Sequence, residues 1–182
     1  MADSLHPGVA DVDLAAVYNR VEAYVEARYG VPVSIADVIA PNTGDFDGAQ
    51  IKIDYDQDLE MALFILVHLF GHTVQWNLSA EWRQLGLDTQ PGKSEEELSR
   101  IHDYERDATR YSLRLLHEAG IHTLDRWATD WWHADWRYLQ HYYRTGEKLD
   151  IRPLLHPGEG ELLSPLPIPP FQPQRFTSRW SF

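Results

Sequence analysis

The chain contains no cysteine at any of its 182 positions. Disulfides and thiolate metal ligands are therefore both excluded, and any transition-metal site must be built from His, Asp and Glu. Basic residues are also few, with 16 Lys and Arg against 28 Asp and Glu and a formal net charge of −12. Because phosphate binding needs clustered Lys and Arg, this balance argues against nucleic acid and against an anionic membrane surface as partners.

Long apolar runs are missing as well. The longest, Met61 to Gly71, contains His68 and is too short to span a bilayer, so we expect no membrane-spanning segment. The N-terminal residues MADSLHPGVADVD are acidic and lack the apolar stretch of a signal peptide, and we therefore expect a cytoplasmic protein. At this length and with 43% hydrophobic residues, the chain can bury one substantial core.

Hydrophobic periodicity predicts an α+β fold with long helices over residues 13–29, 59–77, 94–119 and 124–143. The second helix is apolar nearly all round and should be buried. Residues 31–39 and 50–55 are rich in β-branched side chains and partly alternate, and turn residues separate them. This pattern predicts a hairpin and hence a short antiparallel sheet.

The C-terminal part of the chain changes character. We divide the sequence into an N-terminal arm (1–12), a folded domain (13–145) and an extended tail (146–182) that is rich in proline and aromatic residues. The tail cannot build a core, yet it carries apolar side chains at Leu163, Leu166, Ile168, Phe171, Phe176, Trp180 and Phe182. We expect it to pack on the domain or on a partner, and we expect any homo-oligomer to form through this tail or the aromatic helix 124–143.

The fragment HLFGH, residues 68–72, places two histidines one helical turn apart on the same face. Imidazoles at this spacing can share one Zn²⁺. Spacing alone is weak evidence, because chance gives about 0.4 such pairs in a chain with nine histidines. Two core histidines that hydrogen-bond to the backbone are the simpler alternative. Burying two imidazoles in so apolar a helix is nevertheless costly unless each finds a partner.

Two further residues support a metal site. Gly71 lies in mid-helix, where it costs about 1 kcal/mol relative to alanine, so something should approach the helix closely there. Glu105 falls on the apolar stripe of the next long helix, where a carboxylate needs a cation or a hydrogen-bond donor. A salt bridge to a nearby arginine is the alternative, but Arg106, Arg110 and Arg114 should point to other faces.

His68, His72 and Glu105 would leave one coordination position open, which is typical of catalytic rather than structural zinc sites. A set of two imidazoles and one carboxylate suits Zn²⁺ best, although Fe²⁺ or Mn²⁺ could also bind.

These residues, in the order helix, predicted hairpin, IKIDYDQDLEMALFILVHLFGH and YERDATRYSLRLL, resemble the ImmA/IrrE-type zinc metallopeptidases of the gluzincin group. In that family a strand leads into a helix with an HExxH motif, and the third ligand is a Glu within an ExxA pattern on the following helix. Residues 68–72 keep both histidines and the glycine, and ERDA at residues 105–108 matches ExxA. Over roughly residues 13–120, the resemblance implies a minimal zincin-like domain that holds zinc and has a peptide or protein as its ligand.

The sequence departs from this family at Leu69, which stands where the family carries its general base. Losing general acid–base help typically reduces the rate about 10²–10⁴-fold, but that glutamate is not a metal ligand, so metal binding need not be lost. Four other residues could have roles near the metal. Gln75 could orient a ligand, His102 could be a fourth ligand, a proton shuttle or an ordinary surface histidine, and Tyr104 or Tyr111 could stabilise an oxyanion.

The leading hypothesis is a degenerate metallopeptidase, a pseudo-enzyme that binds metal and has a regulatory or binding role. The first alternative is an active metal-dependent hydrolase or peptidase that uses a different general base. The second alternative is a metal-free interaction module whose histidines are structural.

Overall fold

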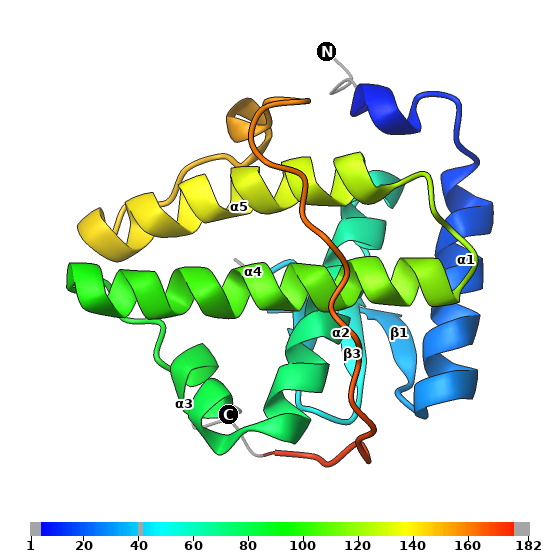
Figure 1. Cartoon of the computed structure of the whole chain (residues 1–182), viewed down its shortest axis with the longest axis horizontal. Helices are drawn as coiled ribbons and strands as arrows, with labels where there is room; N and C mark the ends of the chain where they lie inside the picture. Colours follow the sequence, from blue (N-terminus) through cyan, green and yellow to red (C-terminus); the bar gives the residue numbers. More distant parts are fainter. Residues whose placement is uncertain (1–4, 40–41, 177–182) are drawn as a thin grey trace.

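The computed structural model describes residues 5–39 and 42–176, and the predicted mixed α+β class is confirmed (Figure 1). The α-helices in this part of the chain are α1 (Leu14–Tyr24), α2 (Leu59–Leu78), α3 (Ala80–Leu87), α4 (Glu95–Glu118) and α5 (Asp125–Thr145). The strands are β1 (Val33–Ala36), β2 (Gly44–Phe46) and β3 (Ile51–Asp54). Three short helical turns complete the list, η1 (Pro7–Val9), the π-helical η2 (Val25–Tyr29) and η3 (Arg152–Leu154).

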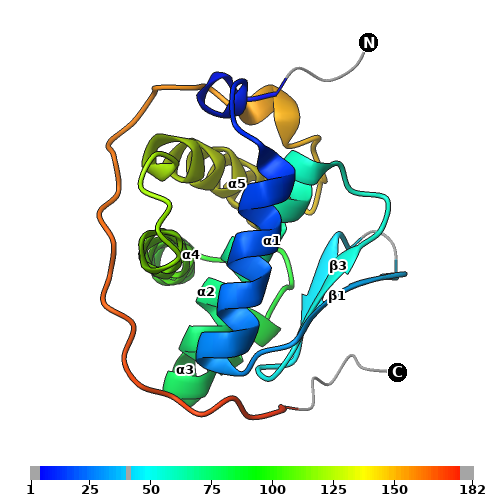
Figure 2. The same ribbon diagram turned by 90° about the vertical axis from the view of Figure 1, so that its right-hand side faces the viewer.

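Helix α2 is the central element of the fold. Figure 2 shows it between the layer of α4 and α5 on one side and the sheet on the other, and α1 packs alongside it. The helix begins at Asp58, whose carboxylate accepts a hydrogen bond from the backbone N–H of Met61. Most of its residues are buried, which confirms the prediction of a buried helix.

By length and composition, α2 is also the one helix among the described residues that could cross a membrane. In this fold, however, 78% of its most apolar window is buried inside the protein. Burial of this kind is what the core helix of a folded domain shows.

The close approach predicted at Gly71 is present, and its source is helix α4. A Cβ atom at Gly71 would lie 2.7 Å from the backbone carbonyl carbon of Ala108 and closer still to the carbonyl oxygen. Glycine therefore allows the backbones of α2 and α4 to pack directly against each other. Helix α4 itself begins with the predicted capping box, in which Ser94 and Glu97 satisfy each other's backbone N–H groups.

The predicted antiparallel hairpin between residues 31–39 and 50–55 is wrong. Strand β1 pairs with β3 in parallel, with Val33 opposite Ile51, and the sheet order is β1-β3-β2. The antiparallel partner of β3 is β2, which lies inside the segment interpreted as one long turn. The true hairpin turn is short. The side chain of Asp47 accepts hydrogen bonds from the two backbone N–H groups that follow it at 49 and 50, and Gly48 adopts a φ of 92°.

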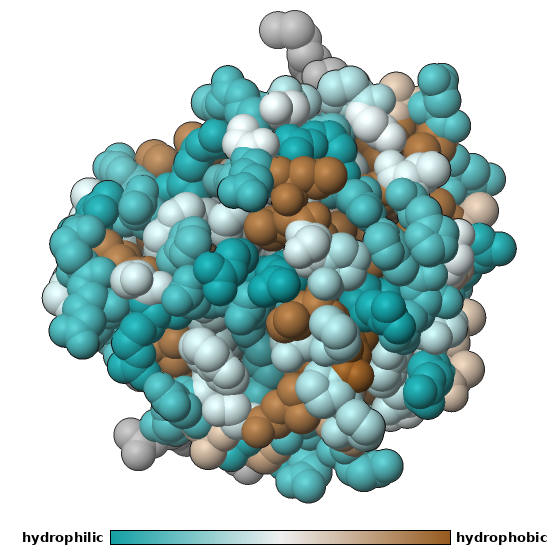
Figure 3. All heavy atoms as spheres, in the orientation of Figure 1, coloured by the Kyte–Doolittle hydropathy of each residue, from teal (hydrophilic) through white to brown (hydrophobic). Residues whose placement is uncertain are grey.

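The described part of the tail crosses the outside of the helical layer, as Figures 1 and 2 both show. The backbone N–H of Leu166 donates to the carbonyl oxygen of Arg110, and the Arg110 side chain donates to the carbonyl oxygen of Ser164. Further along, the ring of Phe171 stacks on Tyr29. On the face that the tail crosses, the surface, with the tail included, shows small separate groups of apolar residues among hydrophilic ones (Figure 3). Trp180 and Phe182, named above in the tail, lie outside the described residues, as do residues 1–4 of the arm.

One buried carboxylate fixes the segment that follows α5. Glu60, in the first turn of α2, is fully buried and accepts hydrogen bonds from the indole N–H groups of Trp127 and Trp131 on α5. Arg152 lies 3.6 Å from the same carboxylate and also pairs with Asp58. The start of α2, helix α5 and the segment at 148–152 are therefore held together, and this arrangement shapes the cavity described below.

Candidate metal centre

Three predicted ligands from two helices come together at the centre of the molecule. His68 and His72 project from α2, and Glu105 projects from α4 at the level where Gly71 lets the helices approach. The Nε2 atoms of the two histidines are 3.1 Å apart, and Glu105 Oε2 lies 3.0 Å from His72 Nε2 and 3.5 Å from His68 Nε2. These atoms belong to a cluster of three side chains that could hold a metal ion.

The spacing of the three atoms fits one small cation. Ligands at about 2.0–2.2 Å from a tetrahedral zinc ion are separated from one another by about 3.3–3.6 Å. The observed separations of 3.0–3.5 Å are close to that edge length. The three atoms therefore form one face of a coordination tetrahedron, and the fourth corner is not supplied by any residue of the cluster.

Gln75 orients His72, as the sequence suggested it could. Its amide nitrogen donates to the backbone carbonyl oxygen of Tyr104, which leaves the amide oxygen 2.9 Å from His72 Nδ1. That oxygen can only accept, so Nδ1 of His72 carries a proton and Nε2 is the ring atom that faces Glu105 and His68. Partners of this kind hold metal-binding imidazoles in the required tautomer. His68 lacks this support, since its buried Nδ1 has no hydrogen-bond partner among the described residues.

The three side chains also shift one another's ionisation. Burial and the neighbouring His72 lower the pKa of His68 to about 4, so its imidazole is neutral. Burial alone would lower the pKa of His72, but Glu105 and Gln75 outweigh it and hold the pKa above its ordinary value. Burial would likewise raise the pKa of Glu105, but His72 outweighs it and holds the pKa low. The raised pKa of His72 and the lowered pKa of Glu105 favour a hydrogen-bonded pair of imidazolium and carboxylate, and a divalent cation that bound here would displace the proton from His72 Nε2.

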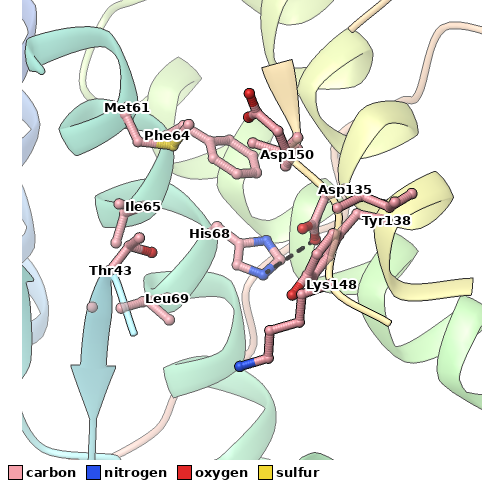
Figure 4. A pocket seen from close by; sticks show the side chains of 13 residues that line it. Thr43, Met61, Phe64, Ile65, His68, Leu69, Asp135, Tyr138, Lys148 and Asp150 are labelled. Atoms are coloured by element: carbon pink, nitrogen blue, oxygen red, sulfur yellow. Dashed lines mark ion pairs between the residues drawn. The ribbon is translucent and has the colours of Figure 1, made fainter. Parts of the chain in front are cut away.

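A cavity of about 460 Å³ opens onto the His68 side of the cluster. Its walls come from α2, from the start of β2, from α5 and from residues 148–151 after α5. Figure 4 shows the imidazole of His68 reaching into this space, with Leu69 on the α2 side and Tyr138 and Lys148 on the opposite side. The lining is mainly apolar and includes Met61, Phe64, Ile65 and Leu149. A ligand held here would lie directly beside the cluster.

Leu69 itself lines this cavity, and its side chain packs against β2. A Cβ atom at Gly44 would lie only 2.9 Å from Leu69 Cδ1, so the leucine fills the space next to the strand. In the family that the sequence resembles, this position carries a proton-accepting side chain. Here an apolar side chain occupies it.

Sequence reasoning missed one residue at this site, Asp135 of α5. Its Oδ2 atom lies 3.9 Å from His68 Nε2, its side chain is 15% exposed, and it lines the same cavity (Figure 4). Burial and the nearby Glu105 raise the pKa of Asp135 to about 8. A signal was present in the sequence, because Asp135 follows the buried Trp131 by one helical turn and so interrupts an otherwise aromatic stripe.

The remaining predicted residues lie outside the cluster. The ring of His102 contacts Trp132 and Trp136 of α5. Tyr104 stacks its ring on His72, but its hydroxyl accepts from the indole N–H of Trp76 and is directed away from the ligand atoms. Tyr111 packs against the main hydrophobic core. None of these three contributes an atom to the group of His68, His72 and Glu105.

Comparison with models of known protein families finds no match for this chain. Comparisons with curated proteins and with solved structures find no match either. The resemblance stated above therefore depends on the residues alone, and the geometry of the site has to support any functional conclusion.

Proposed function

We propose that this protein binds one divalent transition metal, with Zn²⁺ the best suited, through His68, His72 and Glu105, and that it is a metal-dependent hydrolase. The observation that carries the proposal is the triangle of ligand atoms at 3.0–3.5 Å, with His72 held in the right tautomer by Gln75. A metal bound there would polarise a carbonyl group and lower the pKa of water towards 7.

The cavity supports a ligand that is extended and partly apolar. Gly44 and Thr43, at the start of the edge strand β2, form one wall, and apolar side chains of α2 form the floor. An edge strand presents unpaired backbone groups that an extended peptide can use. A peptide is therefore the substrate class we favour for this site.

A pseudo-enzyme with the same metal site is the second candidate. The observation in its favour is Leu69, which fills the position of the general base in the resembling family and cannot accept a proton. Such a protein would bind a peptide or protein partner in the cavity without cleaving it.

Zinc titration of the purified protein tests the metal site. We expect one Zn²⁺ per chain, with binding lost in His68→Ala, His72→Ala and Glu105→Gln. His102→Ala is the matched control, since it removes a histidine one turn from Glu105 that lies outside the cluster. No zinc binding by the wild type, or equal binding by the three ligand variants, would contradict the proposal.

Leu69→Glu separates the two candidates. If the wild type cleaves peptides and a chelator abolishes the activity, the pseudo-enzyme is excluded. If cleavage occurs only after a glutamate is introduced at this position, the wild-type protein is the pseudo-enzyme and the hydrolase is excluded.

A further inference from the structure

We propose that Asp135 is the proton acceptor of this site. In the family that the sequence resembles, the general base lies on the metal-binding helix, whereas here α5 supplies it. This inference rests on the proposed metal site and deepens the hydrolase proposal.

Asp135 lies on the cavity wall beside the three proposed ligands. Its Oδ2 atom is 3.9 Å from His68 Nε2, while the donor atoms of the three ligands are only 3.0–3.5 Å apart. Asp135 is therefore beside the triangle and not part of it, and it does not belong to the group of residues that could share one ion. From the cavity wall, its carboxylate faces the side from which a ligand would reach the metal.

Asp135 also has no structural partner of opposite charge among the described residues. Its polar contact is the imidazole of His68, and no described arginine or lysine forms an ion pair with it. The other buried carboxylates among the described residues accept hydrogen bonds, and Glu60, for example, accepts two indole N–H groups and lies close to Arg152. An acidic side chain that is mostly buried and has no structural donor is uncommon, which points to a role in function.

Core packing holds Asp135 in place relative to His68. The ring of Phe64 lies between the two helices, with ring centroids 5.4 Å from His68 and 5.2 Å from Trp131. Trp131 is fully buried and lies one turn before Asp135 on α5. The distance between the carboxylate and the ligand cluster is therefore fixed by core packing, as preorganised proton transfer requires.

The proton transfer can be written with all atoms accounted for. In its ionised form, which a divalent cation in the adjacent triangle would favour, Asp135 Oδ2 accepts one proton from a water molecule in the cavity while the water oxygen bonds to the carbonyl carbon of the substrate. When the carbon–nitrogen bond of the peptide breaks, the protonated carboxyl returns this proton to the leaving nitrogen. Water has then been added across the bond, and Asp135 is again a carboxylate.

Asp135→Asn tests this role without a known substrate. Cobalt-loaded protein is titrated with acetohydroxamic acid, which must lose a proton to bind in its chelating form, and binding is followed in the visible spectrum. We expect the dissociation constant for the hydroxamate to rise about 10-fold or more, because a charge-assisted hydrogen bond is lost. The cobalt affinity and the affinity for azide, which needs no proton acceptor, should stay within about 2-fold of the wild type.

Asp135→Glu should restore part of the hydroxamate affinity, since it returns a carboxylate. Asp150→Asn is the matched control, because Asp150 lines the same cavity from the segment after α5 without contacting His68. Unchanged hydroxamate binding in Asp135→Asn would overturn the inference. A loss of cobalt affinity as large as that of Glu105→Gln would also overturn it, because Asp135 would then be a ligand. If the wild type binds no cobalt, the proposed metal site fails, and this result is distinct from a failure at Asp135 alone.

Discussion

Gly71→Ala tests whether the contact between α2 and α4 sets the geometry of the metal centre. The added Cβ would lie 2.7 Å from the carbonyl carbon of Ala108, which is 0.7 Å short of the 3.4 Å at which ordinary contact begins. The obstacle is backbone in a buried helix pair, so it cannot rotate away as a side chain would. The two helices must separate, or the helix must bend.

The sign of the stability change is the informative quantity. With no close neighbour, alanine would stabilise the helix by about 1 kcal/mol relative to glycine. Overpacking a buried site costs about 1–3 kcal/mol and occasionally more, and a clash with backbone belongs at the upper end. We therefore expect a net loss of about 2 kcal/mol, or a melting temperature lower by roughly 4–8 °C for a chain of this size.

Differential scanning calorimetry measures this shift, and zinc titration of the same variant gives a second readout. Glu105 lies one turn before Ala108 on α4, so any separation of the helices moves its carboxylate away from both histidines. We expect weaker zinc binding together with the lower melting temperature. A variant that melts at or above the wild-type temperature would refute the reasoning, because it would show that α4 does not press on Gly71.

Three further predictions follow from other contacts. Glu60→Gln should lower the free energy of unfolding by about 2–3 kcal/mol in urea titrations, because a neutral amide accepts the two indole N–H groups more weakly than a carboxylate does. An unchanged free energy of unfolding would contradict this. Gln75→Leu should weaken zinc binding about 10–100-fold while Gln75→Glu retains it, and equal affinities would exclude the orienting role. Burial would raise the pKa of Glu118, but hydrogen bonds from Tyr29 and Arg114 outweigh it and hold the pKa below its ordinary value. The ionised carboxylate therefore stabilises the fold at pH values above the ordinary Glu pKa, and this stabilisation is lost as the pH falls. Between about pH 5.5 and pH 3.5, the free energy of unfolding should therefore depend less on pH in Tyr29→Phe than in the wild type.

The helix pair that carries the ligands could be predicted because its signals are local. Four-residue spacing sets which side chains share a helix face, so His68 and His72 had to point the same way. Glu105 was conspicuous as a carboxylate on an apolar stripe, and its observed partner is His72 and not one of the neighbouring arginines. Gly71 indicated a close approach correctly, although the sequence could not say that the approaching group is the backbone of α4.

A similar local signal on α5 was missed. Trp127 and Trp131 of this helix are buried in the core. Asp135 interrupts the helix face that carries them just as Glu105 interrupts the apolar stripe of α4. The sequence could not indicate that α5 brings Asp135 beside His68, because the packing of α5 against α2 depends on contacts between distant residues, such as that of Phe64 with Trp131.

The sheet shows a different limit. Alternation of apolar residues indicates strands but says nothing about the direction in which they pair. The three residues of β2 lie among turn residues, so their pattern does not distinguish them from a turn, and the antiparallel position beside β3 belongs to β2 and not to β1. The course of the tail likewise depends on long-range bonds, such as that between Arg110 and Ser164, that no local pattern encodes.

Anomalous scattering from crystals of zinc-loaded protein, collected on both sides of the zinc absorption edge, shows whether one metal ion is held by two side chains of α2 and one of α4. We expect a single peak about 2.0–2.2 Å from Nε2 of His68, from Nε2 of His72 and from the carboxylate of Glu105, on the side that opens to the cavity. A peak bound by other side chains, or no peak in crystals soaked with zinc, would contradict this proposed metal site.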